Sequence, residues 1–107
     1  MNTCIHIGNL TRDPELRTTQ NGISVCTFTL AVNRPKDQNG ESRADYIPIK
    51  CFKNRADSCA RYLSKGRKVC VTGTVSAKLH TASDGTSRVS LELAAHEVEF
   101  LSPARGE

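Results

Sequence analysis

The strongest constraint on the fold of this chain is an alternation of larger apolar residues with small or polar residues at a period of two. In residues 25–33 the larger apolar side chains occupy every second position: Cys26, Phe28, Leu30 and Val32. Residues 68–75 and 87–95 alternate in the same way, and residues 97–101 read as a strand or a strand extension. Because successive side chains of a strand point to opposite faces, this period predicts β-strands with one buried face.

Helical periodicity is confined to residues 54–65. There Ala56, Cys59, Ala60 and Leu63 are spaced i, i+3, i+4 and i+7, which places them on one face of a helix. Asn54 is predicted to cap the start of this helix and Gly66 to stop it. Turn dipeptides separate the predicted strands at Asn21-Gly22, Asn39-Gly40 and Asp84-Gly85, and Asp13-Pro14 ends the first apolar run.

With 107 residues, the chain has room for one domain with a modest core. The pattern predicts an all-β fold of five strands with one helix between strands three and four. A five-stranded Greek-key barrel with this helix placement is the OB-fold. We expect the barrel to occupy residues 1–102, followed by a short C-terminal remnant at 103–107.

Composition excludes several other classes. Hydrophobic residues make up 37% and charged residues 24%, as in globular rather than disordered chains. No apolar run reaches the ~20 residues of a membrane span, and no secretory signal is present, so a cytoplasmic location is expected. The cysteines are odd in number and lack CxxC spacing, which predicts free thiols and disfavours zinc. They are Cys4, Cys26, Cys51, Cys59 and Cys70. We expect Cys26, Cys51 and Cys70 to be small buried apolar residues.

The predicted strand Asp45–Lys53 has an unusual outer face. Its core face holds Ile47, Ile49 and Cys51, whereas its other face holds Tyr46, Pro48, Lys50 and Phe52. Aromatic rings give nucleic-acid bases a stacking surface, and lysines pair with phosphates. The alternative, which the residues alone leave open, is that both rings pack under a loop or a second subunit.

Positive charge is concentrated in the middle of the chain. The net charge is +4, but residues 43–88 hold ten Lys and Arg against three acids, a net of +7, and the rest carries five against eight, a net of −3. This asymmetry favours a polyanionic partner. We interpret Arg55 and Arg61 as solvated helix residues. The segment 77–87 is interpreted as a polar loop in a hairpin that extends over a ligand, with a plain connecting turn as the alternative.

Nothing in the sequence indicates catalysis or a cofactor. The histidines His6, His80 and His96 are scattered, and no phosphate-binding loop of the GxxxxGK[ST] kind occurs. Glu97 and Glu99 share one face of a predicted strand, where solvent exposure explains them better than acid–base work. We therefore expect no enzymatic activity, no cofactor and no metal.

The chain resembles bacterial single-stranded DNA-binding proteins. The resemblance begins with Ile7-Gly8-Asn9-Leu10-Thr11-Arg12-Asp13-Pro14-Glu15-Leu16-Arg17 and continues through Val25–Arg34, Asp45–Phe52, Ala60–Gly66 and Val69–Gly73. These blocks follow in the order and spacing of the family over residues 1–101. Each block is weak alone, but together they are specific.

The resemblance implies an OB-fold, assembled as a homotetramer, that binds single-stranded DNA without strong sequence preference in replication, recombination and repair. It implies that Tyr46 and Phe52 stack on bases. We expect His80 to add a weaker stacking surface and a group of basic residues to neutralise phosphates: Arg34, Lys50, Lys53, Lys65, Lys78 and Arg88. The family's frequent tryptophans are missing, since His80 and Pro35-Lys36 stand at those places, so the aromatic surface is thinner.

Family members also carry a linker and an acidic tip that recruits replication and repair enzymes. This chain ends at Glu107 without either, so tail-dependent recruitment is expected to be missing. The segment Thr3–Asn9 is a candidate edge for pairing between subunits, as a tetramer or a dimer. The alternatives are a primosome-type accessory protein that binds single-stranded DNA and a replication helicase, an OB-fold nuclease, and a structural thiol or zinc protein.

Overall fold

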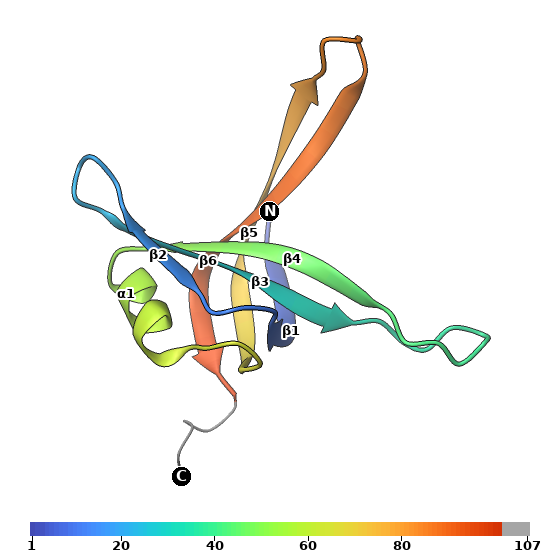
Figure 1. Ribbon diagram of the computed structural model, residues 1–107, viewed down its shortest axis with the longest axis horizontal. Helices are drawn as coiled ribbons and strands as arrows, with labels where there is room; N and C mark the ends of the chain where they lie inside the picture. The colour runs from blue at the N-terminus through green and yellow to red at the C-terminus, as the bar shows by residue number, and fades with distance from the viewer. Residues whose placement is uncertain (102–107) are drawn as a thin grey trace.

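The computed structural model describes residues 1–101 as one β-sheet with a single helix (Figure 1). Residues 102–107, which include the predicted C-terminal remnant, lie outside the described part. The elements in chain order are β1 (Cys4–Leu10), β2 (Glu15–Thr18), β3 (Ser24–Asn33), β4 (Ala44–Phe52), α1 (Lys53–Tyr62), β5 (Lys68–Thr81) and β6 (Ser87–Phe100). This mostly-β architecture with one helix confirms the predicted fold class.

The sheet closes on itself through a short pairing between its first strand and β3. The strand order is β1-β5-β6-β4-β3-β2, with an additional contact between β1 and β3. That contact pairs Asn9 with Ala31 and Leu10 with Leu30. All neighbours are antiparallel except β4 and β6, which run parallel at Ile49↔Leu93 and Lys50↔Ala94. Closure of this kind makes a barrel whose interior is filled by side chains.

The number of strands differs from the prediction, and so does the pair of strands between which the helix lies. The sheet has six strands instead of five, because Glu15–Thr18 pairs with β3 as strand β2. All four residues of β2 are exposed, so the segment shows no buried-face alternation that would reveal it. As a result α1 lies between β4 and β5 rather than between strands three and four.

The helix has the predicted inner face but different ends. Ala56 and Cys59 are buried, and Leu63 follows them into the core. Asn54 does not cap the helix: α1 begins one residue earlier, and the N-cap position is Phe52, which makes no side-chain cap hydrogen bond. The helix ends at Tyr62, so Gly66 lies beyond it, in a turn with a φ of 89°. Within residues 1–101 no helix has the length and apolarity needed to cross a membrane.

The core collects the predicted alternating positions from every long strand. The buried apolar residues are Leu10, Cys26, Phe28, Leu30, Ile49, Cys51, Ala56, Cys59, Leu63, Val69, Val71, Leu93 and Ala95. Cys26 and Cys51 are buried as predicted, but Cys70 is only half-buried, because it alternates with Val69 and Val71 on the other face of β5. All five cysteines are free thiols.

A long hairpin formed by β5 and β6 projects from the barrel (Figure 1). We call its outer part, Ser76–Glu92, the arm. The segment 77–87, interpreted from the sequence as a polar hairpin, is a hairpin and not a plain connecting turn: the β5–β6 ladder continues to Thr81↔Ser87, and only the turn between them is unpaired. A register shift at Thr72/Gly73 lies where β5 turns out of the barrel, as expected for a β-bulge, which bends its strand.

Candidate nucleic-acid interface

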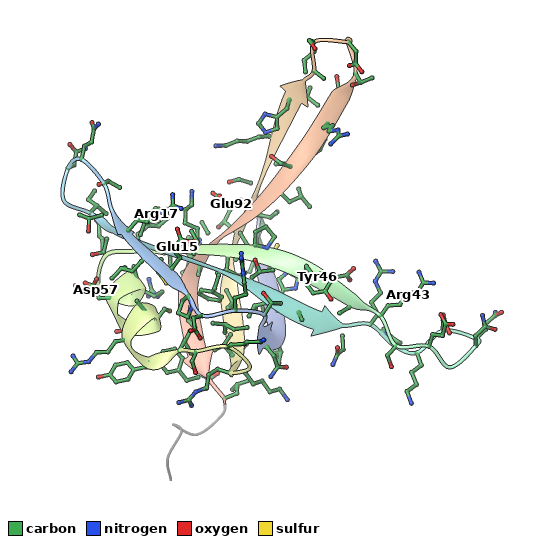
Figure 2. The ribbon with its side chains drawn as sticks, viewed as in Figure 1. Glu15, Arg17, Arg43, Tyr46, Asp57 and Glu92 are labelled. Carbon is green, nitrogen blue, oxygen red and sulfur yellow. The ribbon has the colours of Figure 1, made fainter. Side chains whose placement is uncertain are left out.

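The outer face of β4 presents two aromatic rings and a lysine to solvent. Tyr46 is 67% exposed and Phe52 is 41% exposed, with half-buried Lys50 between them. Ile49 and Cys51 on the other face are buried. Tyr46 lies toward the β3–β4 hairpin (Figure 2), and Phe52 is the last residue of the strand. The predicted division of this strand into a core face and an aromatic–basic face is therefore present in the fold.

The neighbouring strand β3 places only small side chains opposite the outer face of β4. Residues directly opposite in an antiparallel pair share one face of the sheet. The partners of the β4 outer-face residues on β3 are all small: Ala31 opposite Tyr46, Thr29 opposite Pro48, Thr27 opposite Lys50 and Val25 opposite Phe52. The rings therefore have no large side chain directly opposite them on β3. Both rings are exposed, so they offer the open aromatic surface that base stacking requires.

Two of the residues predicted to bind phosphates are already paired with a carboxylate of the protein. Arg34 donates from Nε (2.9 Å) and Nη2 (2.6 Å) to Oδ1 of Asp45. This hydrogen-bonded pair raises the pKa of Arg34 and lowers the pKa of Asp45. Lys50 Nζ lies 3.2 Å from Oε2 of Glu92. A phosphate that binds either cation must compete with its carboxylate partner.

The arm carries a second group of predicted site residues on one of its two faces. Lys78, His80 and Arg88 share the polar face, where His80 stands directly opposite Arg88 and Lys78 opposite Ser90. His80 Nε2 lies 2.9 Å from the Ser90 hydroxyl oxygen. The other face is apolar and exposed, with Leu79 opposite Val89 and Leu91 on the same side. The structure thus brings these three predicted residues together, on an element separate from β4.

The last two predicted residues lie at opposite ends of α1. Lys53 is its first residue and has a φ of 59°, a left-handed conformation that is uncommon for a side chain with a Cβ. It extends the basic series of β4 beyond Phe52. Lys65 lies in the loop after the helix, where its backbone N–H donates to Asp13 Oδ1 at 2.8 Å. That loop precedes β5, whereas the arm is at the other end of β5, so Lys65 is apart from the arm residues.

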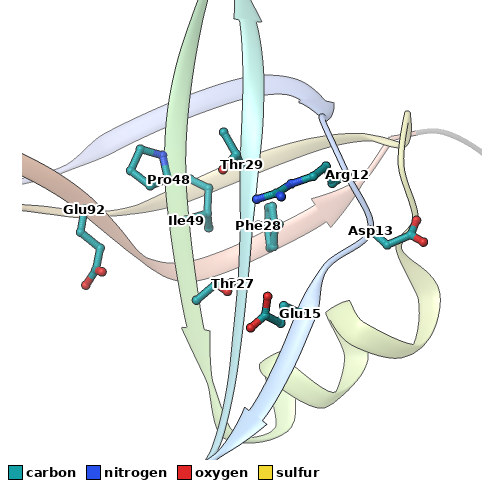
Figure 3. A pocket seen from close by; sticks show the side chains of 9 residues that line it. All are labelled: Arg12, Asp13, Glu15, Thr27, Phe28, Thr29, Pro48, Ile49 and Glu92. Atoms are coloured by element: carbon teal, nitrogen blue, oxygen red, sulfur yellow. The ribbon is translucent and has the colours of Figure 1, made fainter.

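Two hollows border the β4 face. A cleft of about 340 Å³ (Figure 3) is lined by residues of β3 and β4 together with Arg12 and three acids, Asp13, Glu15 and Glu92. A groove of about 700 Å³ begins at Phe52 and runs between the start of α1 and β6. Its lining includes Arg55 and His96, which are not among the predicted binding residues. The signal that could have indicated Arg55 is the run Phe52–Arg55, which has two cations and no acid, whereas no local pattern indicates His96.

The described residues contain no cluster suited to a metal. Within residues 1–101, no group of three or more His, Cys, Asp or Glu could hold a metal ion. The histidines are dispersed over β1, β5 and β6, and His96 Nε2 is 2.6 Å from the Thr74 hydroxyl oxygen.

A closed barrel with an exposed aromatic–lysine–aromatic strand defines the class of oligonucleotide-binding OB-fold proteins. The family model that matches the chain is the single-strand binding protein family, over residues 1–101, and the chain belongs to this family.

Curated relatives cover most of the chain. It is 45% identical over 102 residues to single-stranded DNA-binding protein 2 of Clostridium acetobutylicum, an alignment that covers 94% of this chain and 77% of the relative. It is 42% identical to the single-stranded DNA-binding protein of Clostridium tetani, covering 94% and 70%. It is 43% identical to single-stranded DNA-binding protein 1 of Staphylococcus aureus strain MSSA476, covering 96% and 67%.

Proposed function

We propose that this protein binds single-stranded DNA without strong sequence preference, by stacking bases on Tyr46 and Phe52. The observation that carries the proposal is the pair of exposed rings on one face of β4, with Lys50 between them. Six residues of strand span roughly 20 Å, so the two rings take different bases. Membership of the single-strand binding protein family and the names of the relatives support the same activity.

The phosphates are held by basic residues in three groups. Lys50, Lys53 and Arg34 border the two rings. Lys78, Arg88 and the imidazole of His80 offer a second contact on the arm, and Lys65 a third after α1. Each phosphate neutralised on a single strand contributes about −0.7 to the slope of log affinity against log salt, so binding weakens with added salt.

Binding to single strands, without catalysis, is enough for the proposed role in replication, recombination and repair. A covered strand cannot re-pair or be cut, which is useful wherever single strands arise in replication, recombination and repair. We propose that the protein acts in the cytoplasm, associated with the nucleoid, and that it has no enzymatic activity. Incubating labelled single-stranded DNA with the protein and Mg²⁺ tests the last point, since a nuclease would shorten the strand.

We further propose that β1 pairs subunits together. One edge of β1 is bonded to β5, but β3 meets its other edge only at Asn9 and Leu10. Beside the remaining edge, Ile5 is 64% and Ile7 is 51% exposed. Such an edge is a template for pairing with another chain. We expect a homotetramer, with a dimer as the alternative. Light scattering that finds a monomer at micromolar concentration would contradict both.

The direct test is fluorescence anisotropy with a labelled oligo-dT of ~35 nucleotides, with the matching duplex as competitor and at several salt concentrations. Tight, salt-dependent binding to the single strand and weak binding to the duplex is the expected result. No preference for the single strand would overturn the proposal. It would leave the family resemblance as evidence for fold alone.

Two variants connect this binding to the rings. Stacking contributes ~1–3 kcal/mol per base, so Tyr46→Ala or Phe52→Ala should weaken binding roughly five- to 150-fold. Tyr62→Ala is the matched control, because Tyr62 is also an exposed ring, at 56%, but lies on α1 beside Phe100. If the control weakens binding as much as the β4 variants do, then the β4 rings are not the stacking site.

A further inference from the structure

We infer that the bound strand continues past Phe52 into the groove between α1 and β6, where Lys53, Arg55 and His96 form an additional nucleotide subsite. This inference rests on the proposed single-strand binding and specifies the path that the strand takes beyond the β4 face. It gives a role to Arg55, which the sequence indicated only as a solvated helix residue, and to His96, which lies in no recognised motif.

The groove is continuous with the stacking face because the two share a residue. Phe52 ends the outer face of β4 and also lines the groove of about 700 Å³. The residues that follow along the groove come from α1 and from β6: Lys53, Asn54, Arg55, Ser58, Ala95, His96 and Val98. A strand stacked on Phe52 therefore reaches this groove without crossing another element.

The lining suits a nucleotide. Phe52 supplies an aromatic wall, and Ala95 and Val98 supply apolar surface for a base. Lys53 and Arg55 supply cations for the phosphate, and within residues 1–101 neither forms an ion pair with a carboxylate. The His96 ring is held near its Thr74 partner at 2.6 Å. Ring, apolar surface and cations together are what sequence-tolerant binding of single strands uses.

Charge separates this groove from the cleft on the other side of the β4 face. Two cations and no carboxylate line the α1–β6 groove. The cleft shown in Figure 3 is lined by three carboxylates and one guanidinium. Even when Arg17 and Lys50 are counted as ion-pair partners of Glu15 and Glu92, that cleft is only neutral. A polyanion is therefore drawn toward α1 and not toward β2.

The first test removes one cation from the groove and compares it with an equivalent cation outside it. Arg55→Ala should weaken binding of the ~35-nucleotide oligo-dT about three- to ten-fold and make the salt slope less steep by ~0.7. Arg61→Ala is the control: it removes the same charge from the same helix, but Arg61 lies 5.5 Å over the Tyr62 ring and not in the groove. It should leave affinity and slope within twofold of the wild type.

The second test adds a negative charge to the groove without changing side-chain size. Asn54→Asp places an acid in the first turn of α1, which now has none, so the melting temperature should hold or rise. Affinity for the oligo-dT should nonetheless fall at least threefold. Gln20→Glu, the same amide-to-carboxylate change in the β2–β3 turn, should change affinity less than twofold. A fall in affinity without a fall in stability separates a binding effect from a folding effect.

The outcomes are distinct. Weaker binding by Arg55→Ala and Asn54→Asp, with both controls unchanged, supports the subsite. If the wild type binds single strands but each variant behaves like its control, then the subsite is wrong and the proposed function stands. If the wild type shows no preference for single strands, then the proposed function fails and the subsite fails with it.

Discussion

Lys50 Nζ lies 3.2 Å from Oε2 of Glu92, so the lysine between the two exposed rings of β4 is already paired with a carboxylate from β6. Glu92 lies where the arm joins the barrel (Figure 2). Any phosphate that meets Lys50 must displace Glu92 or share the lysine with it. In the unbound protein, the Glu92 carboxylate therefore occupies the position where a phosphate would pair with Lys50.

Neutralising Glu92 should strengthen binding. Exposed ion pairs are worth up to ~1 kcal/mol, so Glu92→Gln should tighten oligo-dT binding by about two- to five-fold. Glu99→Gln removes an acid from the same strand but faces Cys70 in the β5–β6 ladder, so it serves as the control. Anisotropy titrations of both variants at one salt concentration provide the measurement. Equal gains in the two variants would show a general effect of net charge instead.

Asp45 should restrain Arg34 in the same way, and pH should not release it within the physiological range. The hydrogen bond from Arg34 lowers the pKa of Asp45 below 3.8, so the pair persists above that pH and is lost only as pH falls through the lowered value. Asp45→Asn should tighten binding about two- to five-fold at pH 7. Wild-type affinity for oligo-dT measured at pH 5 and pH 7 should show no gain from release of Arg34. A gain at pH 5 that Asp45→Asn abolishes would contradict this prediction.

Gly73 should be the position on β5 most sensitive to a small substitution. A Cβ built there would lie 2.1 Å from the carbonyl oxygen of Ala94, which is backbone and cannot move aside cheaply. Gly73→Ala should lower the free energy of unfolding by about 2 kcal/mol or more, measured by urea denaturation. Ser76→Ala, at an exposed position farther along the strand, should change it by less than ~0.5 kcal/mol. Equal stability of the two variants would mean that β6 shifts freely at this point.

Two of the three buried thiols, Cys26 and Cys51, should make the fold sensitive to alkali. A hydrogen bond with Cys51 and burial raise the pKa of Cys26 far above 9.0. The hydrogen bond with Cys26 lowers the pKa of Cys51, but its hydrogen bond with Cys59 and its burial outweigh that effect and raise the pKa to about 12. The hydrogen bond with Cys51 lowers the pKa of Cys59, which offsets part of the effect. In the unfolded chain both thiols ionise near 9.0, so the stability that they contribute is complete below that pH and declines above it.

Urea denaturation at pH 7, 9 and 10 measures this decline. Cys26→Ala should be less stable at pH 7 but should lose less stability between pH 9 and 10 than the wild type does. Thiol labelling of the native protein gives a second reading, since half-buried Cys4 and Cys70 should react before the three buried cysteines. A variant with the same alkaline slope as the wild type would show that other groups cause the decline.

The local pattern of the sequence was enough to predict the barrel class, the buried face of α1 and the two faces of β4. Each of these depends on residues a few positions apart, whose burial follows from the period of the element. Strand β2 left no such pattern, because all four of its residues are exposed. In the arm, the alternation that places Val89 and Leu91 on one face was visible in the sequence, but both side chains are exposed, so it marked no buried face there. Backbone pairing holds β2 against β3 and holds the two strands of the arm together. A short stretch of sequence does not show which strand is the partner.

The sequence by itself therefore determined most of the core positions, although not that of Cys70, and it determined that Tyr46, Lys50 and Phe52 share one outer face. Only the tertiary structure decided what surrounds that face. The Lys50–Glu92 and Arg34–Asp45 pairs depend on strand pairing. The groove beside Phe52 exists because parallel pairing of β4 with β6 brings residues 95–98 next to the start of α1. Strand register sets these contacts, and register depends on the whole closed sheet and not on any one segment.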